Sequence, residues 1–201
     1  AKFVEVVVNW GAAFEGDRIR TRWSTTPTVV QEYTRSNGAR LPDDRVNVLL
    51  KMLQATPIYS VDATAIASPV TLQPQMELGS NGGNLAGVLD RLRDRHPERF
   101  EELNQELSRW VPQFNRVLFD TPVQGQRALL LRTRHAHHAI PAHDLSQGTL
   151  FALAILTVAY ISNPAPIVCF EEPDRGLHPR LLRDVRDALY RLSYPEKFGD
   201  K

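Results

Sequence analysis

The stretch "IVCFEEPDRGLHP", Ile167 to Pro179, decides the fold, because an apolar run ends there in two adjacent carboxylates. A short apolar run bounded by turn signals is typical of a buried strand in a parallel sheet. Glu171 and Glu172 follow at the carboxyl end of this predicted strand, where open α/β sheets bind their ligands. Adjacent acids on an extended segment are expected to point to opposite sides, one toward a metal ion and one toward a reacting water. The alternative is a pair of solvated acids at a strand end.

The composition indicates a globular domain without a strong charge bias. The chain has 201 residues, of which 42% are hydrophobic and 23% charged, and its net charge is +1. This charge gives no support to a broad nucleic-acid surface. The single cysteine, Cys169, fits a reducing cytoplasm. It lies inside the apolar strand, so its side chain is expected to be buried in the protein core. The longest apolar run, residues 150–162, is shorter than the about 20 residues that span a bilayer, so we expect a cytoplasmic protein with no membrane partner.

The first part of the chain reads as short antiparallel strands within residues 1–35, separated by turn signals. A helix is expected over residues 43–54 and a short strand over 57–61. Asn84 is placed to cap a helix over residues 85–95, and Pro97 suits the first turn of a second helix. The second helix is expected to bury four residues that recur at helical spacing: Phe100, Leu103, Leu107 and Trp110.

The remaining elements surround the opening stretch. Two strands are expected over residues 115–120 and 127–135. Then follow a buried helix beginning after Ser146, a loop, the apolar strand and a helix over residues 179–192, an order typical of βα crossovers.

The segment "LSQGT", Leu145 to Thr149, is a second candidate site. Ser146 stands at the N-cap of the buried helix, and Gln147 and Gly148 leave backbone N–H groups open in its first turn. Such a helix N-terminus favours anions through its N–H groups and its dipole. The alternative is a serine that only caps the helix.

Together, the two motifs resemble the C-terminal lobe of the ATP-binding-cassette (ABC) ATPases. In that superfamily a signature loop, "LSGGQ" or "LSxGT", precedes a helix, a Walker B strand ending in acids and proline, and a D-loop. Here "LSQGT" resembles the signature, "IVCFEEP" the Walker B strand and "DRGLHP" the D-loop. The sequence of these motifs most resembles that of the RecF-like and overcoming-lysogenisation-type ATPases, relatives of the structural-maintenance-of-chromosomes heads. The segment "GSNGGNLAGVLDRL" also resembles a part of those ATPases.

The resemblance implies a role for each matching position. Glu171 would hold Mg²⁺, through water, and Glu172 would orient and deprotonate the attacking water. The signature residues would contact the γ-phosphate of ATP bound on a second subunit: Ser146, Gln147 and Gly148. The D-loop, with Asp174 and His178, would lie at the interface with a second copy of the head.

The implied fold class is α/β, a P-loop NTPase head of ABC type that lacks its Walker A part. Its expected parts are an antiparallel β-subdomain with a linking helix over residues 1–75, a helical insertion over 76–112 and a signature and Walker B lobe over 113–201. No "GxxxxGK[ST]" motif occurs in the chain. The glycine-rich segment Gly79 to Gly83 lacks a following lysine and is expected to be a turn before a helix. We therefore expect a truncated chain that hydrolyses no ATP alone.

The resemblance implies ATP-driven dimerisation of heads in DNA repair or anti-phage defence, with DNA or a nuclease as a possible further partner. The mixed charge of "RLRDRHPERFEEL" is read as a solvated helix face, with DNA contact as the alternative. Two other functions stay open: a non-catalytic interaction module that keeps the fold, and a zinc protein using a histidine cluster. In that cluster His135 and His137 are expected to share a strand face. The cluster comprises His135, His137, His138 and His143.

Overall fold

The computed structural model describes residues 3–9, 18–24, 51, 54–161, 165 and 167–193. The chain divides into two compact units, Ala1–Ala55 and Thr56–Lys201. In the first unit β1 (Phe3–Asn9) and β2 (Arg18–Ser24) pair antiparallel, with Phe3 opposite Ser24. This pair confirms the antiparallel prediction for these two strands. The rest of the strand region expected within residues 1–35 and most of the helix expected over 43–54 lie outside the described residues.

The second unit contains an antiparallel sheet centred on β6 (Gln126–Thr133). β5 (Phe114–Asp120) pairs along one edge of β6, with Phe119 opposite Leu129. β4 (Val70–Thr71) and β7 (Ala139–Pro141) both pair with β6, at different positions along it. The predicted strands over 115–120 and 127–135 are confirmed, except that the second ends two residues early, at Thr133.

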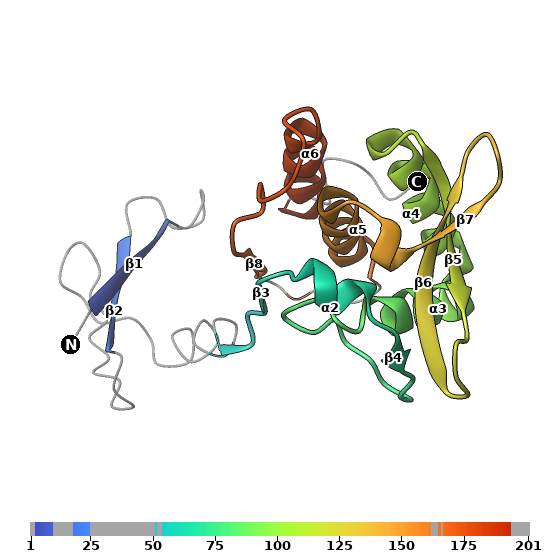
Figure 1. Cartoon of the computed structure of the whole chain (residues 1–201). Helices are drawn as coiled ribbons and strands as arrows, with labels where there is room; N and C mark the ends of the chain where they lie inside the picture. The colour runs from blue at the N-terminus through green and yellow to red at the C-terminus, as the bar shows by residue number, and fades with distance from the viewer. Residues whose placement is uncertain are drawn as a thin grey trace. The chain divides into compact units, whose positions relative to one another are not determined.

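Helices pack on this sheet and on one another around α5 (Gln147–Tyr160). Figure 1 shows α5 between α6 (Leu181–Ser193) on one side and α4 (Pro97–Trp110) with the sheet on the other. α3 (Leu85–Arg95) contacts α4, α5 and β6, and the short α2 (Ala63–Ala67) also contacts α5. A single turn of 3-10 helix, η2 (Ala142–Asp144), connects β7 to the segment before α5.

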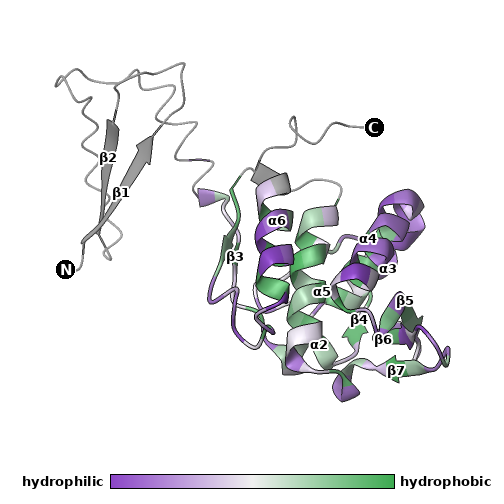
Figure 2. Cartoon of the chain, turned by 90° about the horizontal axis from the view of Figure 1, so that it is seen from above, coloured by the Kyte–Doolittle hydropathy of each residue, from purple (hydrophilic) through white to green (hydrophobic). Residues whose placement is uncertain are grey.

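The predicted buried helix is confirmed as α5, because every residue from 148 to 158 is buried. Figure 2 shows mostly apolar colour along α5, whereas α6 alternates between polar and apolar bands. A helix that is apolar on all sides needs neighbours on all sides, which α2, α3, α4 and α6 supply. Among the described residues no helix is both long and apolar enough to cross a membrane.

The helix signals in the middle of the chain are largely confirmed. α3 begins and ends as predicted, and α4 begins as predicted, with Pro97 in its first turn. The expected apolar face of α4 is buried, from Phe100 at 3% exposed to Leu103 at 0%. The expected cap of α3 is wrong in one respect. The Asn84 side chain accepts from the N–H of Gly79 and donates to the carbonyl of Glu77, so it fixes the preceding loop and bonds no amide of its own helix.

A buried amide side chain ties α4 to the sheet. Asn104 is 1% exposed, and its Nδ2 donates to the carbonyl of Phe100 at 2.9 Å. Its Oδ1 accepts from the N–H of Val117 on β5 at 2.7 Å. Since β5 pairs with β6, this one side chain connects the helical layer to the antiparallel sheet.

Replacing Asn104 with alanine should therefore lower the free energy of unfolding by about 1–3 kcal/mol, because the N–H of Val117 would lose its acceptor inside the core. Urea denaturation of the chain measures this change. The matched control is Asn115→Ala, which removes only an acceptor for Arg132 at a partly buried position. Equal losses for the two variants would show that the Asn104 link contributes no more than a surface contact.

A parallel pair of short strands completes the second unit. β3 (Ile58–Tyr59) pairs with β8 (Cys169–Phe170), with Tyr59 opposite Phe170 and their rings 5.4 Å apart. The parallel direction predicted for the apolar strand is confirmed. The burial predicted for Cys169 is wrong, because its side chain is exposed. Within the described residues β8 pairs with β3 alone, so no second neighbouring strand covers this thiol.

Candidate functional site

A cavity of about 410 Å³ opens at the carboxyl ends of the β3–β8 pair. Its walls come from three places: the residues that follow β3, one side of α5, and the turn that follows β8. α5 contributes two buried apolar residues to the lining, Phe151 at 5% and Ile155 at 2% exposed. The lining residues are Ser60, Val61, Phe151, Ile155, Phe170, Glu171, Glu172, Pro173 and Arg175.

The two carboxylates of the opening stretch both belong to this cavity. Glu171 continues the strand pairing, since its N–H donates to the carbonyl of Tyr59 at 2.8 Å. Glu172 has a φ of 45°, in the left-handed region that residues other than glycine rarely adopt. The extended backbone from which opposite directions of the two acids were predicted is therefore absent at Glu172. The chain turns at Glu172 instead of staying extended, so both acids line one cavity.

Ser60 was missed by the sequence analysis. It directly follows β3, and the register of Tyr59 with Phe170 places it beside Glu171 at the strand ends. The sequence contained part of the signal for Ser60, because a strand was predicted over residues 57–61. If that strand pairs in parallel with the apolar strand, its carboxyl end lies beside the two acids. Two carboxylates and a hydroxyl form a set of hard oxygen donors, which is the donor type that Mg²⁺ takes.

Arg175 brings a positive charge to the same cavity and was also missed. Its Nη1 lies 3.9 Å from Oε2 of Glu172, and the two side chains are 63% and 73% exposed. An ion pair this long and this exposed contributes little to stability. Its guanidinium is nevertheless free to turn toward an anionic group that enters the cavity.

The signature segment forms the first turn of α5, as predicted. Ser146 is the N-cap, and its Oγ accepts from the N–H of Thr149 at 3.2 Å and lies 2.8 Å from Oγ1 of Thr149. The amides of Gln147 and Gly148 have no acceptor among the residues that the structure describes. These N–H groups lie at the positive end of the helix dipole, the arrangement that favours an anion.

The turn after the acids packs against this helix end. A β-carbon on Gly148 would lie 2.4 Å from the carbonyl oxygen of Gly176, so the two backbones are in direct contact. Asp174 accepts from the N–H of Leu177 through its backbone carbonyl at 3.1 Å, and its side chain does not line the cavity. The structure thus brings together, within one chain, the two segments that resemble a signature loop and a D-loop.

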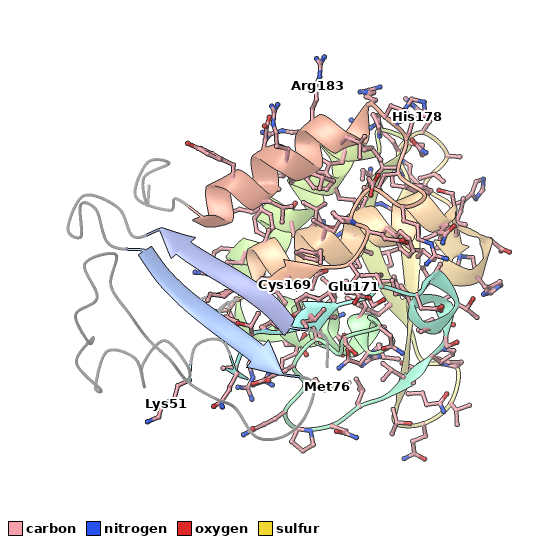
Figure 3. The ribbon with its side chains drawn as sticks, turned by 90° about the vertical axis from the view of Figure 1, so that its left-hand side faces the viewer. Lys51, Met76, Cys169, Glu171, His178 and Arg183 are labelled. Carbon is pink, nitrogen blue, oxygen red and sulfur yellow. The ribbon has the colours of Figure 1, made fainter. Side chains whose placement is uncertain are left out.

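His178 lies apart from the acids. Figure 3 shows Glu171 at the end of the parallel strand pair and His178 well away from it. The imidazole Nδ1 of His178 accepts from the N–H of Arg180 at 3.2 Å, just before α6 begins. Its side chain is exposed. It is not among the residues that line the cavity.

A family model described as "AAA domain, putative AbiEii toxin, Type IV TA system" matches residues 62–198, more than half of the chain. The chain belongs to this family. The match includes α5, β8 and all of the cavity-lining residues except Ser60 and Val61, and it places the chain among the AAA-type, P-loop ATPase domains. Nucleotide binding is the general function of these domains, and ATP with Mg²⁺ is their usual ligand. No curated protein matches the chain.

The histidine cluster does not form a metal site in this AAA-family chain. His135 and His137 lie in the turn between β6 and β7, since β6 already ends at Thr133, and His137 has a φ of 55°. The expectation that these two share a strand face is therefore wrong. No group of three or more potential metal ligands gathers among the residues that the structure describes.

The glycine-rich segment Gly79 to Gly83 is a turn, as expected. Gly82 has a φ of 75° and lies against the buried side chain of Ile66. The carbonyls of Ser80 and Asn81 accept from the N–H groups of Ser60 and Asp62. The segment therefore supports the loop that follows β3.

Proposed function

We propose that this chain supplies the signature and catalytic-acid half of an ATP site in a RecF-like, ABC-type head that works as a dimer. One observation carries the proposal: two carboxylates at the end of a parallel strand line a cavity, and the turn that follows them packs on the N-terminus of α5. Acids for metal and water and an anion-favouring helix end are the groups that phosphoryl transfer uses. In the proposed dimer each chain supplies its acids to one site and its helix end to the other. Membership of an AAA-type family supports ATP as the ligand.

Each residue is proposed for one task. Glu171 holds Mg²⁺ through water, and this ion neutralises charge on the phosphates when it is bound. Glu172 accepts the proton of the attacking water, for which its exposed carboxylate is available. Ser146, Gln147 and Gly148 donate to the γ-phosphate of a nucleotide held mainly by the second subunit, through the hydroxyl and the open amides of α5. Asp174 and His178 contact the second subunit.

The phosphate loop of the complete site must come from another segment or another polypeptide, because no "GxxxxGK[ST]" motif occurs in these 201 residues. The same observation favours a second candidate function, a non-catalytic interaction module that keeps the fold. The two functions differ in one measurable respect. The ATPase proposal requires magnesium-dependent ATP turnover by the native full-length protein, and the module proposal requires none.

We place the activity in anti-phage defence or DNA repair in the cytoplasm, with DNA or a nuclease as a further partner. The toxin–antitoxin description of the family supports the defence process over repair. Charge supports no large DNA surface, since the net charge is +1.

A complementation experiment tests the composite site. Ser146→Arg should block the signature, and Glu172→Gln should remove the base, so each variant of the native protein should hydrolyse ATP at a small fraction of the wild-type rate. In a mixed dimer of the two, one site combines an intact Glu172 with an intact Ser146 from the partner. Mixing equal amounts should therefore restore roughly a quarter of the wild-type turnover, because half of the dimers are mixed and each has one good site.

Ser68→Arg is the control for introducing arginine at an exposed serine, and it should keep wild-type turnover. If the mixture stays as inactive as its components, the signature does not act in trans and the dimer proposal fails. If the wild-type native protein shows no turnover, the interaction module is the better description.

A further inference from the structure

Two glycines meet where the first turn of α5 touches the turn that carries the acids. The contact on the Gly148 side is with backbone: a β-carbon there would meet the Gly176 carbonyl oxygen at 2.4 Å and the Leu177 Cα at 3.7 Å. Separations below 3.0 Å are not tolerated between such atoms, so any larger residue must move the turn. Glycine at position 148 is therefore required for this close approach.

The Gly176 side of the contact has a different character. Gly176 has a φ of 68°, and a β-carbon there would lie 3.3 Å from three atoms of the Gln147 side chain. Gln147 therefore covers Gly176, while Gly176 accommodates the left-handed backbone. We refer to the contact of Gly148 and Gln147 with Gly176 as the glycine contact.

The turn transmits this contact to Glu172. The N–H of Arg175 donates to the carbonyl of Glu172 at 2.9 Å, and the N–H of Leu177 donates to the carbonyl of Asp174 at 3.1 Å. Leu177 is 8% exposed and belongs to the core cluster. Glu172 is thus the first residue of a hydrogen-bonded turn whose other end is held in the core and against α5.

We infer that Gly148 and Gly176 are positioning residues that fix Glu172 relative to the N-terminus of α5. The inference rests on the proposed function, because it concerns the placement of the proposed base. A ligand that shifts the first turn of α5 would shift the turn with Glu172, and the reverse also holds. The anion-favouring helix end and the base then act as one unit although they come from separate segments.

Hydrogen exchange of the full chain tests the contact without any nucleotide. Gly148→Ala should raise the exchange rates of the Arg175 and Leu177 amides by about tenfold or more, as expected for a local opening. The amide of Val117, held by Asn104, reports global unfolding and should change less. Gly125→Ala is the control for adding a methyl group where there is room, because a β-carbon there meets nothing within 4 Å. Gly125 shares its positive φ, 78°, with Gly176 and not with Gly148, so it also controls for backbone strain in the Gly176 variant.

A second variant covers the case in which Gly148→Ala does not fold. In Gly176→Ala the atoms nearest the new β-carbon belong to the flexible Gln147 side chain, and the positive φ adds backbone strain. This variant should therefore fold and raise the exchange rates of the Thr149 and Leu150 amides. In the double variant Gln147→Ala/Gly176→Ala these exchange rates should return toward the wild-type values. Any increase that remains should be no larger than the local increase that backbone strain causes in Gly125→Ala. The inference is overturned if neither glycine variant changes exchange across the contact, or if Val117 changes by the same factor.

An activity measurement on the native protein completes the test. Gly176→Ala should lower kcat for ATP about tenfold while KM stays within about twofold, since a displaced base slows the chemical step more than binding. Gly125→Ala should leave both constants unchanged. If exchange shows no coupling while Glu172→Gln is inactive, the inference fails and the proposed function stands. If Glu172→Gln keeps wild-type turnover, the proposed function fails, and the exchange results still decide whether the contact exists.

Discussion

Replacing Glu172 with glutamine should lower ATP turnover of the native protein by about 10²–10⁴-fold, the usual contribution of general acid–base catalysis. Glutamine keeps the size and hydrogen-bonding reach of the side chain but cannot accept the proton of the attacking water. ATP binding should persist, because no proposed phosphate contact is removed. Dimers with bound ATP should therefore accumulate, which steady-state kinetics together with size-exclusion chromatography in Mg²⁺–ATP would show.

Glu98→Gln is the control for this charge change. Glu98 is an exposed acid in the first turn of α4, away from the residues that line the cavity, so turnover should stay at the wild-type rate. Wild-type turnover by Glu172→Gln would show that Glu172 is not the base. In that case Glu171, which lines the same cavity, would become the next acid to test.

The second large effect concerns the core helix. Leu153 on α5 is 0% exposed, and Leu153→Ala should lower the free energy of unfolding by about 2–5 kcal/mol. The loss combines the transfer of apolar surface with the void that rigid neighbours leave, and α5 has neighbours on all sides. Urea denaturation of the full chain measures it as a lower midpoint with little change in slope.

Leu182→Ala is the matched control, since Leu182 belongs to α6 but is 39% exposed. It should change the free energy of unfolding by less than about 1 kcal/mol. If the two leucine variants lose equal stability, α5 would not be the centre of the core.

Local sequence signals predicted the helices well. The boundaries of α3, the start and buried face of α4, and the Ser146 cap of α5 follow from periodicity, proline position and capping chemistry. These signals act within a few residues of one another. For the same reason the β5–β6 pair was recognisable as two neighbouring strands.

Features that depend on distant segments were not predicted. The pairing of β4 with β6 joins residues far apart in the sequence, and the exposure of Cys169 depends on which strands lie beside β8. Ser60 reaches Glu171 only through the parallel register of β3. The positive φ of Glu172 and the contact between Gly148 and Gly176 leave no mark in the sequence beyond the glycines themselves.

The exposed position of Cys169 gives the chain a built-in attachment point. It is the single cysteine among 201 residues, and it stands two positions before Glu171 on the strand that leads into the cavity. A thiol-directed fluorophore would therefore label one place per chain. Without any introduced residue, its emission would report when another surface closes over the carboxylates.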